Sequence, residues 1–195
     1  MSEEFAKEHL QQELQWVRES LLQTLESLSE YDVRRPLTST GTNLLGLVQH
    51  LTASELVYLG DIFQRPSPMP HARFDDPGYR NRDSLWVTES QSRADVLDRY
   101  RQACGHSDAT ISALPIDAHG VVPWWPRPDV TLLGVLVHVL TETNRHAGHA
   151  DILREHLLGP PAGDVDWAAH RDRIESAARR TSGRGCPDRG QLPSD

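Results

Sequence analysis

The sequence predicts an all-α protein, a four-helix bundle with a short extra helix near its C-terminus. Apolar residues recur at steps of three and four along most of the chain, as they do on one face of a helix. Little of the chain shows the strict alternation of a half-buried strand. Two proline-studded stretches, 64–83 and 115–129, interrupt the helical pattern. Four long helices with two long connections are typical of a bundle.

The first predicted helix covers residues 4–30 and ends before Pro36. Its apolar stripe consists of Leu10, Leu14, Val17, Leu21, Leu25 and Leu28. The second helix begins near Thr42 or Asn43, either of which can cap it, and runs to about residue 64. The stretch 64–83 then forms a long crossover.

The third predicted helix opens at Thr88, where "TESQ" has the form of a capping box, and continues to about Leu114. The fourth is capped by Asp129 or Thr131 and stops near Gly159, which two prolines follow.

Beyond the fourth helix, a short fifth helix with Trp167 is expected between residues 164 and 180, and residues 181–195 are expected to be disordered. The predicted domains are therefore a bundle over residues 1–160 and a helix with a tail over 161–195. Seven residues at 44–50 and seven at 132–138 read alike, "LLGLVQH" and "LLGVLVH". Either an internal repeat or shared core packing would produce this match.

The composition of the chain limits the kinds of molecule that we expect it to bind. The net charge of −8 argues against a nucleic acid or an anionic membrane and favours a small-molecule substrate. An acidic N-terminus and the lack of a membrane-length apolar run predict a cytoplasmic protein. Cys104 and Cys186 form no C-x-x-C pair, so a metal would be held through nitrogen and oxygen.

One face of the fourth helix carries the candidate metal-binding residues. His138, Glu142 and His146 follow at steps of four, and His149 returns to nearly the same line. Glu142 and His146 lie on neighbouring turns, with Cβ atoms about 6 Å apart, so both can reach one metal ion. His50 ends an apolar stretch on another helix and is either a third ligand or an ordinary surface or core histidine.

Two motifs carry a family resemblance, "TGTNLLGLVQHL" at 40–51 and "HVLTETNRHAGHADILREH" at 138–156. With them, residues 5–158 resemble the DinB-like superfamily of metal-binding four-helix bundles, in particular its actinobacterial branch. The resemblance implies an up-down-down-up bundle that holds a divalent metal by one residue of helix two and two of helix four.

In many DinB-like relatives the pair on helix four is His-x-x-x-His, whereas this chain has glutamate at the first position. It is therefore more similar to the mycothiol-dependent maleylpyruvate isomerase branch, which implies His50, Glu142 and His146 as ligands. Such a set suits Zn²⁺, and Ni²⁺, Mn²⁺ or Fe²⁺ would also be accepted.

The resemblance also implies a reaction class, because several relatives use mycothiol or another low-molecular-weight thiol as cosubstrate. The leading hypothesis is a metal-dependent thiol transferase or isomerase that acts on a small electrophile. The alternative is a non-catalytic metal-binding or small-molecule-binding stress-response protein whose bundle face forms a homodimer.

Other residues are candidates for the same site. His149 either acts on bound water as a general base or makes a supporting hydrogen bond, and Arg145 either binds a substrate carboxylate or pairs with an acidic neighbour. Trp124 and Trp125, in "PWWP", either wall the ligand pocket or cap the bundle's apolar end. His138 either lines the pocket or packs.

Overall fold

The computed structural model describes residues 3–73, 76 and 85–182. As predicted, the described chain is mostly helical, and its only strands form one small hairpin. Its elements are α1 (Glu3–Gln23), α2 (Glu30–Arg34), α3 (Leu44–Tyr58), the short helix η1 (Asp61–Phe63), α5 (Arg93–Ala113), β1 (His119–Val121), β2 (Asp129–Thr131), α6 (Leu132–Leu158) and α7 (Trp167–Ser182).

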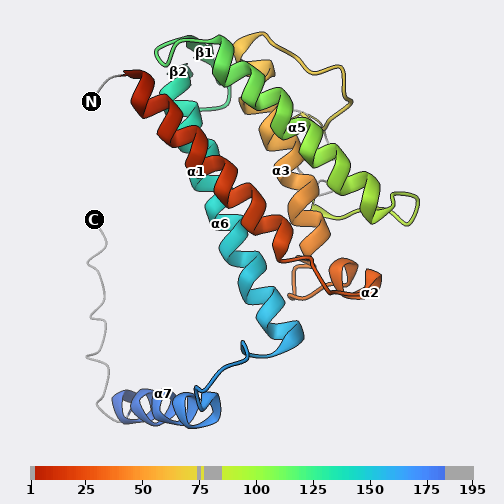
Figure 1. The fold of residues 1–195 in the computed structure, drawn as a ribbon, viewed down its shortest axis with the longest axis vertical. Helices are drawn as coiled ribbons and strands as arrows, with labels where there is room; N and C mark the ends of the chain where they lie inside the picture. The colour runs from red at the N-terminus through yellow and green to blue at the C-terminus, as the bar shows by residue number, and fades with distance from the viewer. Residues whose placement is uncertain (1–2, 74–75, 77–84, 183–195) are drawn as a thin grey trace, which may run out of the picture. The chain divides into compact units, whose positions relative to one another are not determined.

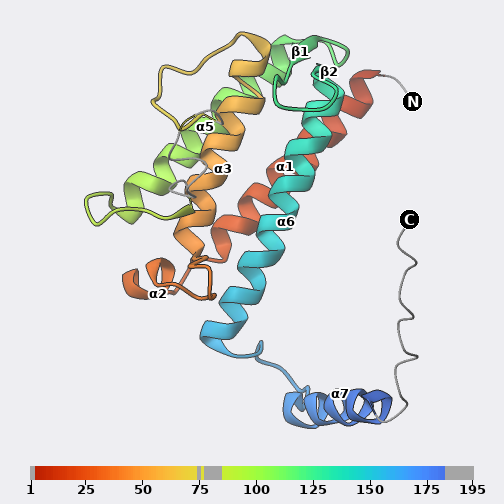
Figure 2. The ribbon, with the colours of Figure 1, turned by 180° about the vertical axis from the view of Figure 1, so that it is seen from behind.

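The four long helices α1, α3, α5 and α6 pack side by side (Figure 1). α1 contacts α6 and α5, and α3 contacts α5 and α6, so each helix has two neighbours. α1 and α6 run in one direction, whereas α3 and α5 run in the opposite direction (Figures 1 and 2). A single cluster of leucine and valine side chains fills the space between them.

The predicted apolar stripe of the first helix is buried except for Leu10, which is partly buried. The helix ends earlier than predicted, at Gln23 instead of residue 30. Ser27 adopts a left-handed backbone conformation, with φ of 62°, which turns the chain. Ser29 then caps the separate short helix α2 by accepting a hydrogen bond from the Asp32 N–H. Leucine spacing continues through this turn, so periodicity alone did not reveal it.

The second helix is capped by Asn43, whose Oδ1 accepts a 2.8 Å hydrogen bond from the Gly46 N–H. It ends at Tyr58, before the predicted limit of residue 64. A side chain at Gly60 would collide with the carbonyl oxygen of Leu56, so the tight turn there requires glycine. All but one of the α3 residues are buried, as expected of a helix that is apolar nearly all round.

The predicted start of the third helix, at Thr88, is wrong, because the helix begins later in the sequence. Thr88 and Gln91 do bond each other, but they belong to a turn, and α5 begins at Arg93. The capping box is made by Ser92 and Asp95, each of which bonds the other's backbone N–H. Two overlapping capping patterns stood in the sequence, and the one that is continuous with the helix forms the cap.

The fourth helix starts as predicted, with Thr131 Oγ1 accepting from the Gly134 N–H at 3.3 Å. The stretch before it, expected to be a loop, contains the hairpin of β1 and β2, in which His119 pairs with Thr131 and Val121 with Asp129. Strands of three residues are too short to show a recognisable alternation of apolar and polar residues in the sequence.

A buried ion-pair network joins three of the long helices. Arg18 of α1 donates from Nε and Nη2 to the two carboxylate oxygens of Glu55 on α3, at 2.7 and 2.6 Å. Its Nη1 donates to Asp108 of α5 at 2.8 Å. Arg18 and Glu55 are only 2% and 1% exposed. The network therefore links α1, α3 and α5 through one guanidinium.

Residues Gly159–Asp195 form a second compact unit, separate from Met1–Leu158. Its described helix, α7, agrees with the predicted fifth helix, and most of its side chains are exposed. The predicted disordered tail falls, from residue 183, outside the described residues, as does part of the predicted crossover 64–83. Among the described residues, no helix combines the length and apolar character needed to cross a bilayer.

The substitution Arg18→Met should destabilise the protein, because it leaves the buried Glu55 carboxylate without its partner. We expect a loss of about 3–5 kcal/mol in the free energy of unfolding, measured by urea denaturation. Arg101→Met, at an exposed position of α5, is the matched control and should change stability little. Equal stability of the two variants would contradict the assigned role of the network.

Candidate metal centre

Two helices supply the side chains of the candidate centre. On α6 the spacing of four residues brings His138, Glu142 and His146 onto one face. α3 packs against α6 and contributes His50, which is 9% exposed. The structure therefore brings together the three residues that the family resemblance implied as ligands.

The carboxylate of Glu142 stands between the two imidazoles. Its Oε1 lies 3.0 Å from His146 Nε2 and 3.5 Å from His50 Nε2, and the two histidine rings are 5.0 Å apart at 72°. One ligand atom from each residue lies within 4.8 Å of the other two. Nitrogen and oxygen ligands around a tetrahedral Zn²⁺ are about 3.4 Å apart, given bonds of about 2.1 Å. The three side chains thus fit a common ion with little movement.

The charge of the centre also suits a cation. Hydrogen bonds from His146 and then His50 hold the pKa of Glu142 well below its usual range, so the carboxylate stays ionised at neutral pH. A neutral imidazole that donates from Nε2 carries its proton where a metal ion would bind. With the ring proton of each histidine on Nδ1 instead, an ion in that position would meet two neutral nitrogens and one negative oxygen.

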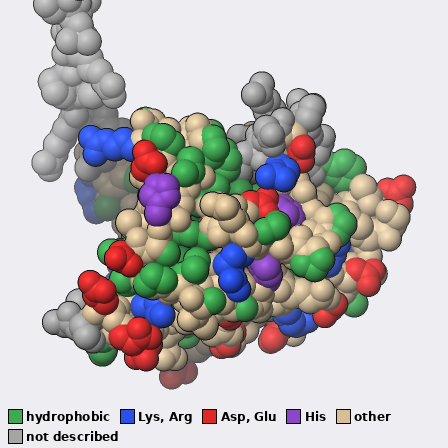
Figure 3. Space-filling view, turned by 90° about the horizontal axis from the view of Figure 1, so that it is seen from above, with side chains coloured by type: hydrophobic (Ala, Val, Ile, Leu, Met, Phe, Trp, Pro, Cys, Tyr) green, Lys and Arg blue, Asp and Glu red, His purple; other side chains and the backbone are tan. Residues whose placement is uncertain are grey.

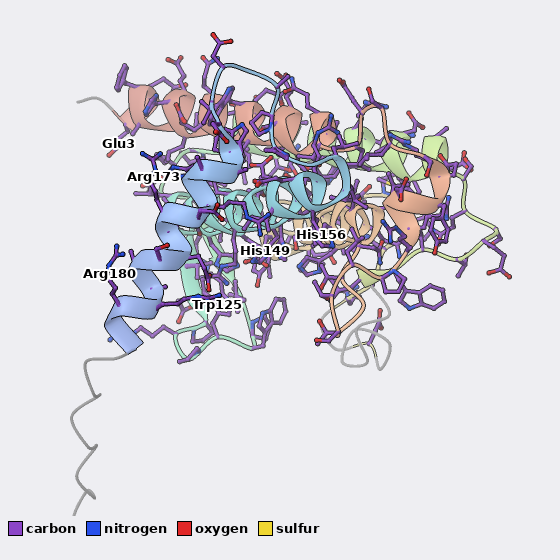
Figure 4. The ribbon with its side chains drawn as sticks, turned by 90° about the horizontal axis from the view of Figure 1, so that it is seen from below. Glu3, Trp125, His149, His156, Arg173 and Arg180 are labelled. Atoms are coloured by element: carbon purple, nitrogen blue, oxygen red, sulfur yellow. The ribbon has the colours of Figure 1, made fainter. Side chains whose placement is uncertain are left out.

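Two further candidates on α6 lie beside this group. Arg145 Nη1 is 3.8 Å from Glu142 Oε2, and its side chain is mostly exposed. His149 contacts His146 instead of Glu142, with their Nδ1 atoms 3.4 Å apart. Figure 4 labels His149 and His156 on α6 and Trp125 in the segment before it.

The remaining candidates form an aromatic cluster, which we define as Tyr58, Trp124, Trp125 and His138. The His138 ring lies 4.6 Å from the Tyr58 ring and 4.7 Å from the Trp125 ring. Burial lowers the pKa of His138, so this imidazole is neutral at neutral pH. His138 therefore packs within the aromatic cluster, one turn before Glu142.

Tyr58 is the member of this cluster that sequence reasoning missed. It follows His50 by eight residues, slightly more than two helical turns along the same helix. That spacing was readable in the sequence, but α3 is so uniformly buried that its apolar pattern does not indicate which side faces α6. Burial raises the pKa of the Tyr58 phenol above its usual value.

A cavity of about 390 Å³ lies beside the aromatic cluster. Its lining consists of Val57, Asp61, Ile62, Arg73, Val121, Pro123 and Trp124. Figure 3 views the protein from the end that carries the hairpin, where hydrophobic side chains lie among acidic and basic ones. A mainly apolar cavity with a few polar groups is the usual form of a small-molecule site.

Comparison with known proteins finds a match to a protein family. A family model described as mycothiol-S-transferase matches residues 9–159. This span includes most of α1, the whole of α3, α5 and α6, and every residue of the candidate centre. No curated protein matches the chain in sequence.

Metal binding should depend on the three convergent residues. We expect purified protein to bind about one divalent ion per chain, and His146→Ala or Glu142→Gln to weaken binding at least about tenfold. Elemental mass spectrometry after dialysis against a weak chelator measures this.

The matched control for that experiment is His156→Ala, an exposed histidine of the same helix that should bind as the wild type does. Retention of full metal content by both centre variants would contradict the assignment of the ligands.

Proposed function

The chain belongs to the mycothiol-S-transferase family, and from that premise we propose a divalent-metal-dependent transfer of a mycothiol-type thiol to a small electrophile. The family match over residues 9–159 carries the thiol and the reaction class. The convergence of His50, Glu142 and His146 carries the metal dependence. We further propose that residues 1–160 form the catalytic domain, an up-down-down-up four-helix bundle, followed by the separate segment 161–195. The packing and directions of α1, α3, α5 and α6 support this topology.

We propose Zn²⁺ as the ion, held by His50 Nε2, Glu142 Oε1 and His146 Nε2. Ni²⁺, Mn²⁺ and Fe²⁺ accept the same donor set. When bound, such an ion lowers the pKa of a thiol that reaches it and so favours the thiolate at neutral pH. Three protein ligands leave a further position open to the thiol.

The proposed reaction balances without an added oxidant or reductant. The thiol sulfur forms a bond to the electrophilic carbon, the bond from that carbon to its leaving group breaks, and the thiol proton is released with the leaving group. The described part of the chain has one cysteine, Cys104, which is buried and has a raised pKa. The nucleophile in this proposal is therefore the sulfur of the cosubstrate.

We propose supporting roles for the residues around the centre. His146 that binds an ion through Nε2 carries its proton on Nδ1, and His149 Nδ1 is placed to accept that hydrogen bond. His149 thereby orients a ligand, one of the two roles that the sequence left open. Arg145, which is exposed beside Glu142, is suited to a carboxylate of the thiol or of the electrophile. Trp124 walls the small-molecule site, and Trp125 and His138 support it by packing in the aromatic cluster.

The competing function, a non-catalytic metal-binding or small-molecule-binding protein, has no support from the family match. The homodimer remains a prediction of the sequence. We also propose a cytoplasmic location, which agrees with the finding that no described helix could span a membrane.

Turnover should require both the metal and the thiol. We expect wild-type protein with Zn²⁺ to consume mycothiol when benzyl chloride or styrene oxide is added. Chelation or Glu142→Gln should lower the rate about 100-fold or more, because thiolate formation would lose its cation. Loss of free thiol over time is the measurement, and His156→Ala serves as the active control. Wild-type protein that is full of metal but inactive with several electrophiles would leave the non-catalytic binding protein as the better account.

A further inference from the structure

Tyr58 places a phenol hydroxyl in the interior, at the end of α3. Its side chain is 5% exposed. The ring packs against His138 at 4.6 Å, Trp125 at 5.9 Å and Trp124 at 6.1 Å. The surrounding aromatic rings restrict the phenol to a narrow range of orientations.

Two indole side chains, those of Trp124 and Trp125, pack against the Tyr58 ring and offset part of the effect of burial on the pKa of its phenol. An indole N–H can only donate, so the phenol oxygen is the acceptor in any hydrogen bond between these side chains. An N–H donor beside the phenol oxygen draws electron density from it and makes its O–H a stronger hydrogen-bond donor. Since burial favours the protonated phenol, the hydroxyl retains its hydrogen at neutral pH.

Tyr58 is linked to the candidate centre through His138. His138, in contact with Tyr58, precedes Glu142 by one helical turn, about 6 Å. The negative charge of Glu142 acts on the phenol and contributes to its raised pKa. Trp124, whose ring contacts that of Tyr58, and Val57, which precedes Tyr58 in the sequence, line the cavity of about 390 Å³. A molecule that extends from the cavity toward the centre would therefore pass the hydroxyl.

We propose that Tyr58 is a catalytic residue, whose hydroxyl donates a hydrogen bond to an oxygen atom on the electrophile. The inference rests on the proposed function and adds a substrate class, electrophiles in which a carbon–oxygen bond breaks, such as epoxides. The apolar part of the electrophile occupies the cavity lined by Trp124, Val57 and Ile62.

For an epoxide the step balances as follows. The thiol sulfur forms a bond to one ring carbon, the bond from that carbon to oxygen breaks, and its electron pair stays on the oxygen. Tyr58 O–H stabilises that developing negative charge, and the oxygen finally takes the proton lost by the thiol, which gives a β-hydroxy thioether. An alkyl chloride differs, because chloride leaves with its electron pair and needs no donor of this kind.

The difference between these substrates supplies the test. Tyr58→Phe removes only the hydroxyl and should lower kcat for styrene oxide about 10- to 100-fold. For benzyl chloride, of similar size and shape, kcat should stay within about twofold of wild type. Both reactions are run with mycothiol and Zn²⁺ on the full chain, and melting temperatures check the fold. Tyr31→Phe, at a tyrosine that is 72% exposed, is the matched control and should change neither rate.

Trp124→Phe is a second variant, which removes an indole N–H next to the Tyr58 ring. Because Trp124 also lines the cavity that both electrophiles would occupy, both rates should fall, and the styrene oxide rate should fall about threefold further than the benzyl chloride rate. Equal losses on both electrophiles would show a purely structural role for Tyr58 and overturn the inference alone. Unchanged rates in Tyr58→Phe would also overturn it. A wild-type enzyme inactive on both electrophiles would overturn the proposed function first and this inference with it.

Discussion

The position of α3 depends on the buried network of Arg18, Glu55 and Asp108. Because α3 is apolar on nearly every side, burial of its side chains alone would stabilise several rotations about its axis almost equally. A bidentate pair between Arg18 and Glu55 is directional and is costly to leave incomplete, so it selects one rotation. Glu55 follows His50 by five residues and therefore lies well round the helix from it. With Glu55 held toward α1, His50 is directed toward α6.

From this orientation follows the geometry of the candidate centre. The carboxylate of Glu142 receives one imidazole from its own helix and one from α3, so the local spacing on α6 supplies only part of the group. The third donor depends on contacts between helices that are distant in the sequence. Such a centre is formed only when the helices are packed, and its affinity for an ion is linked to the stability of that packing.

Much of the fold and of the candidate centre could be predicted from the sequence, and the features that could not be predicted have physical reasons. Periodicity gave the four long helices, and Asn43 and Thr131 were recognisable caps. Helix ends were less accurate, because the leucine spacing continues through the left-handed turn at Ser27. At the site, regular spacing placed Glu142 and His146 together, whereas Tyr58 was missed because its neighbours come from a loop and another helix. Contacts of that kind have no periodic signature.

The hairpin between α5 and α6 has a consequence for how substrate preference evolves. Backbone bonds between Val122 and Pro128 and between Leu132 and Ala118 close the base of the loop that carries Trp124 and Trp125. α6 continues directly from β2, so the ligands on that helix do not depend on the loop's own residues. Insertions and exchanges at positions 123–127 can therefore accumulate without disturbing the candidate metal centre. Paralogues of this chain can diversify by exchanging this short loop while they inherit the same candidate centre.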